Sequence, residues 1–197
     1  MTIDINNMLD SILESISRID YIKPTDIPNI PLYMDQVTTF MDSQLESSKR
    51  YDSDKILTKT MINNYAKNDL LPPPIKKKYS KEHLLVLIFI YYFKNLISIT
   101  DIQKLLNPIT DKYFSGNESL SLEDIYNEVF LLEKDQIDIM KEDIKQKYQI
   151  SQEIFPNAED DQNFLQTFSF ICLLSFDVYV KKQIIETLID QFPQNKK

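Results

Sequence analysis

Glycine is nearly absent from this chain of 197 residues, in which Gly116 is the only one. Average usage would be roughly 7%. Glycine supplies the positive-φ positions of hairpin turns and lets the backbone approach a phosphate group closely. Its scarcity therefore excludes the phosphate-binding loop, the dinucleotide fingerprint and the nucleophile elbow. It also disfavours a β-rich fold, so the sequence predicts an all-α protein.

Cysteine and histidine are equally scarce, with one residue of each, Cys172 and His83. An internal disulfide is impossible, which suits a reducing compartment, and a zinc site with two histidine ligands is excluded. A dyad of Cys172 and His83 is the one cysteine–histidine pair that the composition permits. We instead expect Cys172 to pack as a small apolar side chain and His83 to be a partly exposed residue near a helix start.

Acidic residues occur in groups that could do acid–base chemistry if burial separated their pKa values. These groups are Asp124 with Glu128, Asp138 with Glu142, and the run at 159–161. All of them stand beside lysines and polar residues, so a solvated surface or a helix cap is the expected role. The sequence predicts no enzyme: no catalytic residues, no metal site and no cofactor.

Long apolar runs are missing as well. One run, 84–93, stops at Lys94, and another, 164–180, contains Gln166 and Asp177. Both fall short of the roughly 20 uninterrupted residues that a membrane span requires. The first residues show no basic segment followed by an apolar one. We therefore expect a cytoplasmic protein with no membrane partner.

Helical periodicity is what the sequence does contain. Apolar residues recur at a period close to 3.6 between positions 3 and 19, which predicts an amphipathic helix. Three prolines between positions 23 and 31 make the next stretch non-helical, either a linker or an extended strap. Further helices are predicted over 32–45, over 57–67, after an N-cap at Ser80, and over 100–106. A turn is expected at Asn107-Pro108.

The C-terminal part is predicted to consist of two long helices. Ser121, with Asp124 three residues later, is the expected N-cap of a helix that continues to about Tyr148. Its three-four apolar spacing is interrupted once, between positions 132 and 137. The second helix, 162–192, is apolar nearly all round in its first half. We predict that it is buried, either in a core or against another subunit.

Charge is unevenly distributed along the chain. The net charge of −8 opposes unselective binding of the whole molecule to nucleic acid. Between Lys55 and Lys104, however, nine lysines stand against three acidic residues, an excess of six positive charges. A local basic patch of this kind is what binds a polyanion.

The helix predicted at 57–67 has two unlike sides. Thr58 is its expected N-cap, and the apolar side carries Met61, Ile62 and Tyr65. The opposite side, called here the polar side, consists of Lys59, Thr60, Asn63, Asn64 and Lys67. Hydroxyl, amide and ammonium groups contact base edges and phosphates in protein–DNA complexes. We therefore predict that this side enters the major groove of a duplex.

Three consecutive lysines, Lys76, Lys77 and Lys78, follow the helix after three prolines. We predict that they lie on an extended segment and contact the flanking phosphates as a wing. Together with Thr58 and the polar side, they complete the set of predicted DNA-binding residues. A lysine run can also be no more than a solvated surface, and that alternative stays open at this point.

The segment 61–73, with the sequence MINNYAKNDLLPP, resembles the recognition helix and exit of MerR-type regulators. In those proteins a basic wing, a Tyr-Ser helix start and a helix of the form Ser-(apolar)-x-(acidic)-Ile-x-(basic)-Leu-Leu follow. Residues 79–80 and 98–106 match these features in order. The chain departs from the pattern at Asn63-Asn64, where an Arg-Tyr pair is usual, and at Asp69, which replaces a glycine. The resemblance implies a winged helix-turn-helix that dimerises through a later long helix.

Three segments together, 32–37, 57–65 and 72–80, resemble more closely a bacterial family known only as domain of unknown function 1836. The likeness extends from about Ile27 to the C-terminal helix. It implies a helical fold and brings no settled activity.

These inferences combine into one prediction with an alternative. We expect an N-terminal helix and proline-rich linker at 1–31, a MerR-like winged helix-turn-helix domain at 32–107, and a C-terminal helical region at 118–192. The chain would bind double-stranded DNA as a transcriptional regulator and form a homodimer through its C-terminal helices, which would serve dimerisation or effector binding. The alternative is a helical adaptor that binds a partner protein, not DNA, through the apolar C-terminal helix.

Overall fold

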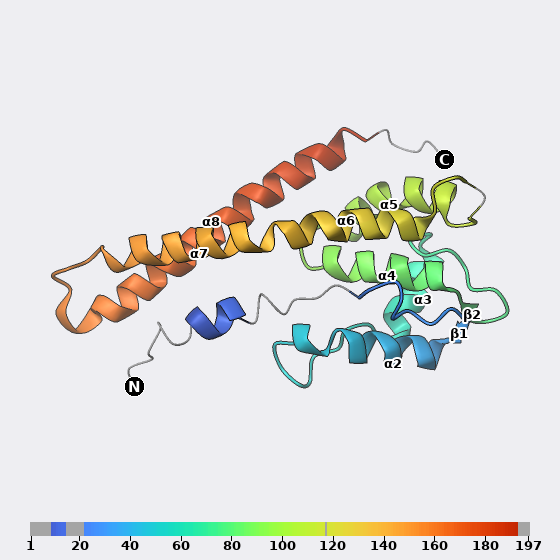
Figure 1. Ribbon diagram of the computed structural model, residues 1–197, viewed down its shortest axis with the longest axis horizontal. Coiled ribbons are helices and arrows are strands. Elements are labelled where there is room, and N and C mark those ends of the chain that lie inside the picture. The colour runs from blue at the N-terminus through green and yellow to red at the C-terminus, as the bar shows by residue number, and fades with distance from the viewer. Residues whose placement is uncertain (1–8, 15–21, 117, 193–197) are drawn as a thin grey trace. The chain divides into compact units, whose positions relative to one another are not determined.

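The computed structural model describes residues 9–14, 22–116 and 118–192 (Figure 1). Helices dominate, and within these residues the strands are two short ones that form a two-stranded sheet. The all-α prediction is confirmed. The chain divides into two compact units, one of residues 1–21 and 129–184, the other of residues 22–128 and 185–197.

The unit at 22–128 contains several helices and a short antiparallel sheet. Its elements in chain order are β1 (Leu32–Tyr33), α2 (Met34–Gln44), the short 3-10 helix Glu46–Ser48, α3 (Lys59–Lys67), β2 (Lys78–Tyr79), α4 (Lys81–Phe93), α5 (Ile99–Tyr113) and the start of α6 (Leu122–Asp135). Strand β1 pairs with β2, with Leu32 opposite Tyr79 and Tyr33 opposite Lys78. The proline-rich segment before β1 is non-helical, as predicted.

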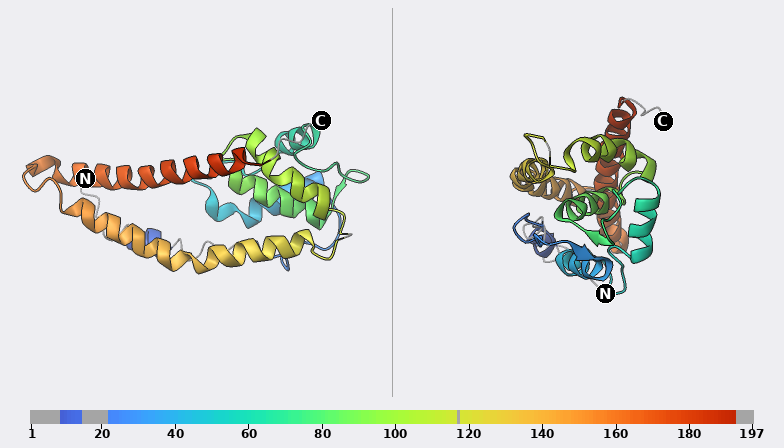
Figure 2. Two further views of the ribbon diagram at one scale, coloured as in Figure 1. Left: turned by 90° about the horizontal axis from the view of Figure 1, so that it is seen from above. Right: turned by 90° about the vertical axis from the view of Figure 1, so that its right-hand side faces the viewer.

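Helix α4 forms the centre of this unit. All nine residues from His83 to Tyr91 are buried, because apolar side chains surround the helix on every side. In Figure 2 it lies between α2, α3 and α5. The hydroxyl of Tyr126, itself fully buried, donates to the carbonyl of Ile22 at 2.7 Å and ties α6 to the start of the unit. The short apolar run at 84–93 is therefore a core helix.

Helix α5 is longer than the sequence predicted. It runs from Ile99 to Tyr113 with Pro108 inside it, so the predicted turn at Asn107-Pro108 is wrong. Its apolar side buries Ile102, Leu106 and Thr110, one turn apart. Burial of that side outweighs the roughly 3 kcal/mol that a proline costs within a helix.

The unit at 129–184 consists of the end of α6, α7 (Ile137–Gln152), the 3-10 turn Glu159–Asp161 and most of α8 (Gln162–Asp190). The single helix predicted to reach Tyr148 is two helices that meet at Gln136. The break falls within the interruption of the apolar spacing between 132 and 137. A change of spacing in the sequence therefore marked a real change in the backbone.

The predicted N-terminal amphipathic helix lies partly outside the described residues. Within them, 9–14 is helical, and Leu9 and Leu13 are buried against Tyr148. The partly buried Ile144 and Phe170 complete this small cluster.

Helix α8 is not buried in the core of its unit, so the first alternative of the prediction is wrong, while burial against another subunit stays a prediction. Between 162 and 184 its only buried residue is Gln166, and Cys172 is exposed instead of packed. By length and composition alone α8 could cross a membrane. Only 6% of its most apolar stretch is buried within the protein. The sequence had suggested that this run was too interrupted for a span. One helix of this kind is weak evidence for a membrane protein.

Candidate nucleic-acid interface

Helix α3 begins and is seated as its sequence predicts. Thr58 caps it, since its side-chain oxygen accepts a hydrogen bond from the backbone N–H of Met61 at 3.2 Å. Ile62 is fully buried and Tyr65 nearly so. Met61, expected on the apolar side, is 36% exposed and contributes less to the packing. Ile62 and Tyr65 therefore hold α3 in the unit.

The polar side of α3 faces solvent. All five of its residues are exposed: Lys59, Thr60, Asn63, Asn64 and Lys67. Lys59 forms an ion pair with Asp35 of α2, a partner that the sequence did not suggest. Both side chains are well exposed, so the pair contributes roughly 0 to 1 kcal/mol and can open when a phosphate competes.

The exit from α3 depends on Asp69. Its φ of 55° lies in the left-handed region, where glycine is the usual residue. The N–H groups of Leu70 and Leu71 then reach back to the carbonyl of Tyr65 at 2.9 and 3.2 Å. Leu70 and Leu71 are both buried at 1% exposure. This closes the helix and turns the chain sharply toward the prolines.

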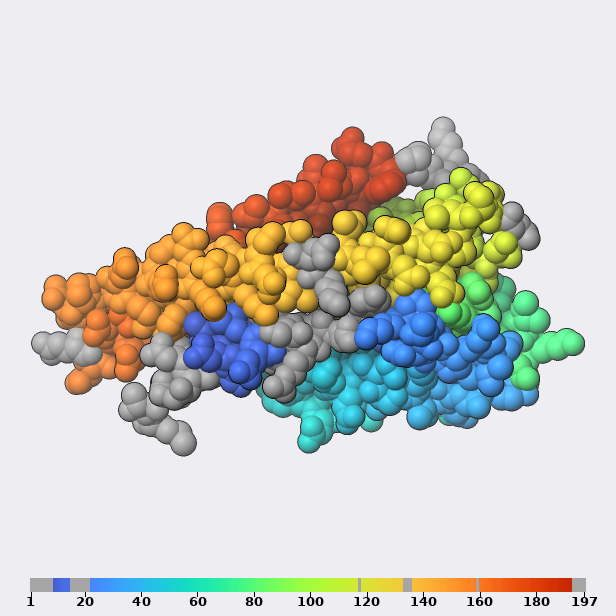
Figure 3. All heavy atoms as spheres, in the orientation of Figure 1, coloured from blue at the N-terminus to red at the C-terminus, as the bar shows by residue number. Residues whose placement is uncertain are grey.

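A hairpin with a two-residue turn follows at residues 75–78 and is called here the wing hairpin. The backbone groups of Ile75 and Lys78 exchange both hydrogen bonds, at 3.1 and 3.0 Å. Lys76 and Lys77 form the turn with φ of 50° and 64°. The predicted extended segment is therefore wrong for these two residues. The hairpin projects from the surface (Figure 3, green at the right) with both lysines exposed.

The third lysine has a different position. Lys78 belongs to β2 opposite Tyr33 of β1, and its ammonium lies 4.9 Å from the centre of the Tyr33 ring. This contact holds Lys78 at the base of the hairpin, half-buried. A pocket of about 440 Å³ opens here, with Lys76, Lys78 and Ser80 among its lining residues. Strand β1 could not be predicted from the sequence, because a strand of two residues has no periodicity.

The family described as Domain of unknown function (DUF1836) matches residues 22–129, more than half of the chain. The chain belongs to the DUF1836 family. The matched region coincides with the unit at 22–128 that holds α3 and the wing hairpin. No curated protein and no solved structure matches the chain.

His83 of the DUF1836 region is buried at 2% exposure, so the prediction of a partly exposed residue is wrong. Its Nδ1 accepts a hydrogen bond from the backbone N–H of Ser80 at 2.9 Å. The ring packs edge-on against Tyr79 and Phe114, with centroids 5.4 and 4.7 Å away. Burial lowers the pKa of His83, although the backbone carbonyl of Pro73 opposes this shift. His83, in the first turn of α4, therefore connects this helix to the residues at the base of the wing hairpin.

Several of the nine lysines between Lys55 and Lys104 form contacts within the structure. Lys94 donates to the carbonyl of Ile56 at 2.6 Å, and burial lowers its pKa. Lys81 pairs with Glu123 at 2.8 Å, and Lys104 pairs with Asp101 and Asp190. Of these nine, and within the described residues, Lys55, just before α3, and Lys67, Lys76 and Lys77 are exposed and have no ion-pair partner. The positive charge available to a polyanion is thus concentrated on α3 and the wing hairpin.

Proposed function

We propose that the DUF1836 region is a MerR-like winged helix-turn-helix that binds double-stranded DNA, and that the chain is a transcriptional regulator without enzymatic activity. Helix α3 would enter the major groove through its polar side. Lys76 and Lys77 would contact phosphates of the flanking backbone.

The order of elements supports this proposal. Helices α2 and α3 form a contacting pair, and the wing hairpin follows α3 directly. Strand β1, immediately before α2, pairs with β2, the second strand of the hairpin. A helix pair flanked by a hairpin is the arrangement that a winged helix-turn-helix presents to a duplex. Asp69 also adopts the left-handed backbone that the glycine of MerR-type regulators would supply.

The turn of the wing hairpin is the observation that carries the proposal. Both of its central residues have positive φ, and such turns strongly prefer Asn-Gly or Asp-Gly. A lysine in the left-handed region costs on the order of 1 kcal/mol. Two lysines at these positions therefore sacrifice stability and place two ammonium groups at the tip. Backbone strain of this kind is concentrated at functional sites.

The proposal also accounts for the acidic remainder of the chain. A net charge of −8 keeps unselective attraction to DNA weak. Discrimination would then come from Asn63 and Asn64, because amide side chains form paired hydrogen bonds with adenine in the major groove.

The test is the binding of a fluorescent random duplex as a function of salt, for wild type and for the variant Lys76→Asn/Lys77→Gly. Asn-Gly suits the turn, so this variant removes two charges and relaxes the hairpin instead of unfolding it. We expect wild-type binding to fall log-linearly with salt. The slope of the logarithm of the binding constant against the logarithm of the salt concentration should be smaller in magnitude by about 2 for the variant.

The matched control is Lys112→Asn/Lys145→Asn, which removes the same charge from exposed positions on α5 and α7. Its slope should equal that of the wild type. DNA binding is refuted if the wild type does not bind the random duplex at low salt and if selection from a random duplex library yields no preferred sequence. The helical adaptor then becomes the better account.

A further inference from the structure

Helix α8 exposes more apolar surface than the rest of its unit can cover. Between 162 and 184, eight large apolar side chains are 37 to 69% exposed: Phe164, Phe168, Ile171, Phe176, Val178, Tyr179, Val180 and Ile184. At roughly 100 Å² for each half-exposed side chain, they offer on the order of 800 Å² around the whole helix. Five of them lie on the side opposite α7 and carry on the order of 500 Å²: Phe164, Phe168, Ile171, Val178 and Tyr179. Specific interfaces take roughly 600 to 1,000 Å² from each partner, so these side chains supply most of what a small interface needs.

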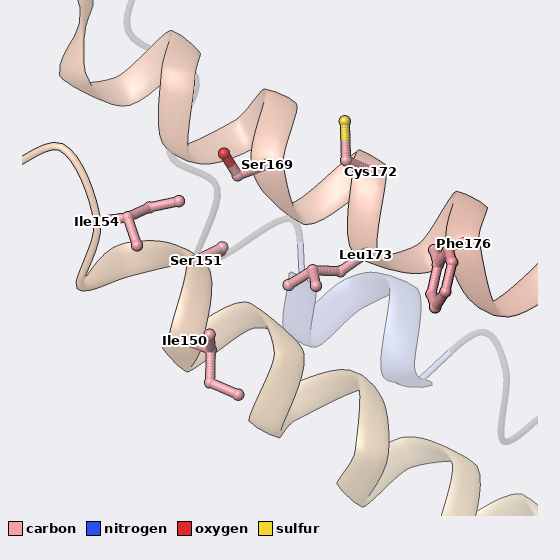
Figure 4. A pocket seen from close by; sticks show the side chains of 7 residues that line it. All are labelled: Ile150, Ser151, Ile154, Ser169, Cys172, Leu173 and Phe176. Carbon is pink, nitrogen blue, oxygen red and sulfur yellow. The ribbon is translucent and has the colours of Figure 1, made fainter.

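One side of α8 is occupied by α7. Gln166 donates to the carbonyls of Gln152 and Ile154 at 2.7 and 3.1 Å. Asp177 pairs with Lys147 at 2.8 Å, and the Phe170 ring packs on Tyr148. Figure 4 shows Leu173 on this side, with its side chain toward α7, whereas Cys172 points away.

The opposite side of α8 carries a second stripe with heptad spacing. Its residues, called here the outer stripe, are Phe164, Phe168, Ile171, Ser175 and Val178, at intervals of four, three, four and three. Residues so spaced share one face of a helix and form the seam of a helix pair. All five are exposed. A helix with two opposite seams, one of them uncovered, is built to contact helices on both sides.

A lipid bilayer is a poor cover for this stripe. Helix α7, which is tied to α8 by Gln166 and by the Lys147–Asp177 pair, bears Lys141, Asp143 and Lys145 among its charges. Both helices of the hairpin would have to enter the hydrocarbon together. Charged residues at that depth strongly disfavour insertion.

The outer stripe is complementary to itself in antiparallel orientation. If two copies of α8 cross between Ile171 and Cys172, Phe168 lies opposite Ser175 of the partner subunit, a large side chain against a small one. Phe164 then lies opposite Tyr179 of the partner subunit, an exposed residue that borders the outer stripe beside Val178. Asp160 and Asp161 lie next to Lys181 and Lys182 of the partner subunit, so the charges are complementary at both ends.

We infer that the chain forms a two-fold symmetric homodimer in which the outer stripes of two α8 helices pack antiparallel. The two α7–α8 hairpins then form one layer of four helices in the order α7, α8, α8 and α7, with the two-fold axis between the α8 helices. This inference concerns the unit at 129–184 and does not depend on whether the DUF1836 region binds DNA.

The first test is sedimentation equilibrium of the full chain across a wide concentration range. We expect wild type to be a dimer and Ile171→Asp to raise its dissociation constant by about 30-fold or more, because the charge falls twice at the centre of the interface. Leu120→Asp makes the same change at an exposed apolar residue outside α8 and should leave the dimer intact. Circular dichroism checks that each variant keeps its helices.

A charge exchange tests the antiparallel orientation. Lys181→Glu/Lys182→Glu should weaken the dimer through repulsion from the acidic run of the partner subunit. Adding Asp160→Lys/Asp161→Lys should restore it, which a parallel pair would not do. A wild-type monomer at all concentrations, or a dimer unaffected by Ile171→Asp, would overturn the inference. So would a monomer that co-sediments with phosphatidylcholine–phosphatidylglycerol vesicles, which would assign the stripe to a membrane.

Discussion

His83 illustrates how much a single side chain can depend on its surroundings. It sits three residues after the N-cap Ser80 and accepts that residue's backbone N–H through Nδ1. The proton of the neutral ring must therefore lie on Nε2. A second proton would place two donors against each other in a buried site. The neutral form is consequently the one that stabilises the fold.

The stability of the protein should therefore fall as the solution is acidified below about pH 6.5. Burial lowers the pKa of His83 in the folded chain, so the unfolded state binds more protons in the window just below the ordinary value. The stabilisation by neutral His83 is complete above that window and is lost as pH falls through it toward the folded pKa. Urea denaturation at several pH values measures this dependence.

The control for this prediction is His83→Asn, whose side-chain oxygen can accept the Ser80 N–H but does not titrate. Because the chain has no other histidine, the variant should have a nearly flat stability between neutral pH and the onset of carboxylate titration. An equal decline in both proteins would show that His83 is not the responsible group.

At the scale of elements, helix ends follow local rules and helix interiors follow packing. Ser98 and Ser121 cap α5 and α6 by accepting the N–H of the residue three positions later, each at 3.1 Å. The hydrogen bonds from Ser121 also lower the pKa of Asp124. Pro108, in contrast, lies inside α5 against its own preference, since burial of the neighbouring apolar side decides.

Replacing Pro108 should stabilise the protein. Pro108 is exposed, has no N–H to donate and crowds the carbonyl one turn earlier. We expect Pro108→Ala to raise the free energy of unfolding by about 1 to 3 kcal/mol, measured by urea denaturation. Asp111→Ala, at another exposed position of α5, should change it by no more than about 0.5 kcal/mol. A loss of stability in Pro108→Ala would mean that α5 needs a proline-induced bend.

At the scale of the whole molecule, the two units differ in how complete their cores are. The unit at 22–128 surrounds α4 on all sides, and every residue from His83 to Tyr91 is buried. The unit at 129–184 has a small cluster around Leu9, Leu13 and Tyr148, while α8 stays exposed. A unit of the second kind gains stability from a partner.

The melting temperature should accordingly rise with protein concentration. A homodimer is stabilised by mass action, whereas the stability of a monomer does not depend on concentration. Differential scanning fluorimetry over a hundred-fold concentration range should show this rise for wild type and little of it for Ile171→Asp. A constant melting temperature in both proteins would contradict a dimer that is coupled to folding.

Local patterns in the sequence determined most of the helices, the caps at Thr58, Ser80 and Ser121, the exposed polar side of α3 and the family. Each depends on neighbours within one or two turns, which periodicity and capping chemistry reveal. The break at Gln136 is of the same kind, because it interrupts a local spacing.

Only the tertiary structure decided the remaining features. The hairpin turn at Lys76-Lys77 contradicts the rule that such turns need glycine, and it forms where β1, over 40 residues earlier, pairs with β2. The burial of His83, the helical Pro108 and the Lys59–Asp35 pair likewise depend on residues from other elements. The exposure of α8 was open for the same reason: an apolar helix must be covered, but its sequence does not state by what.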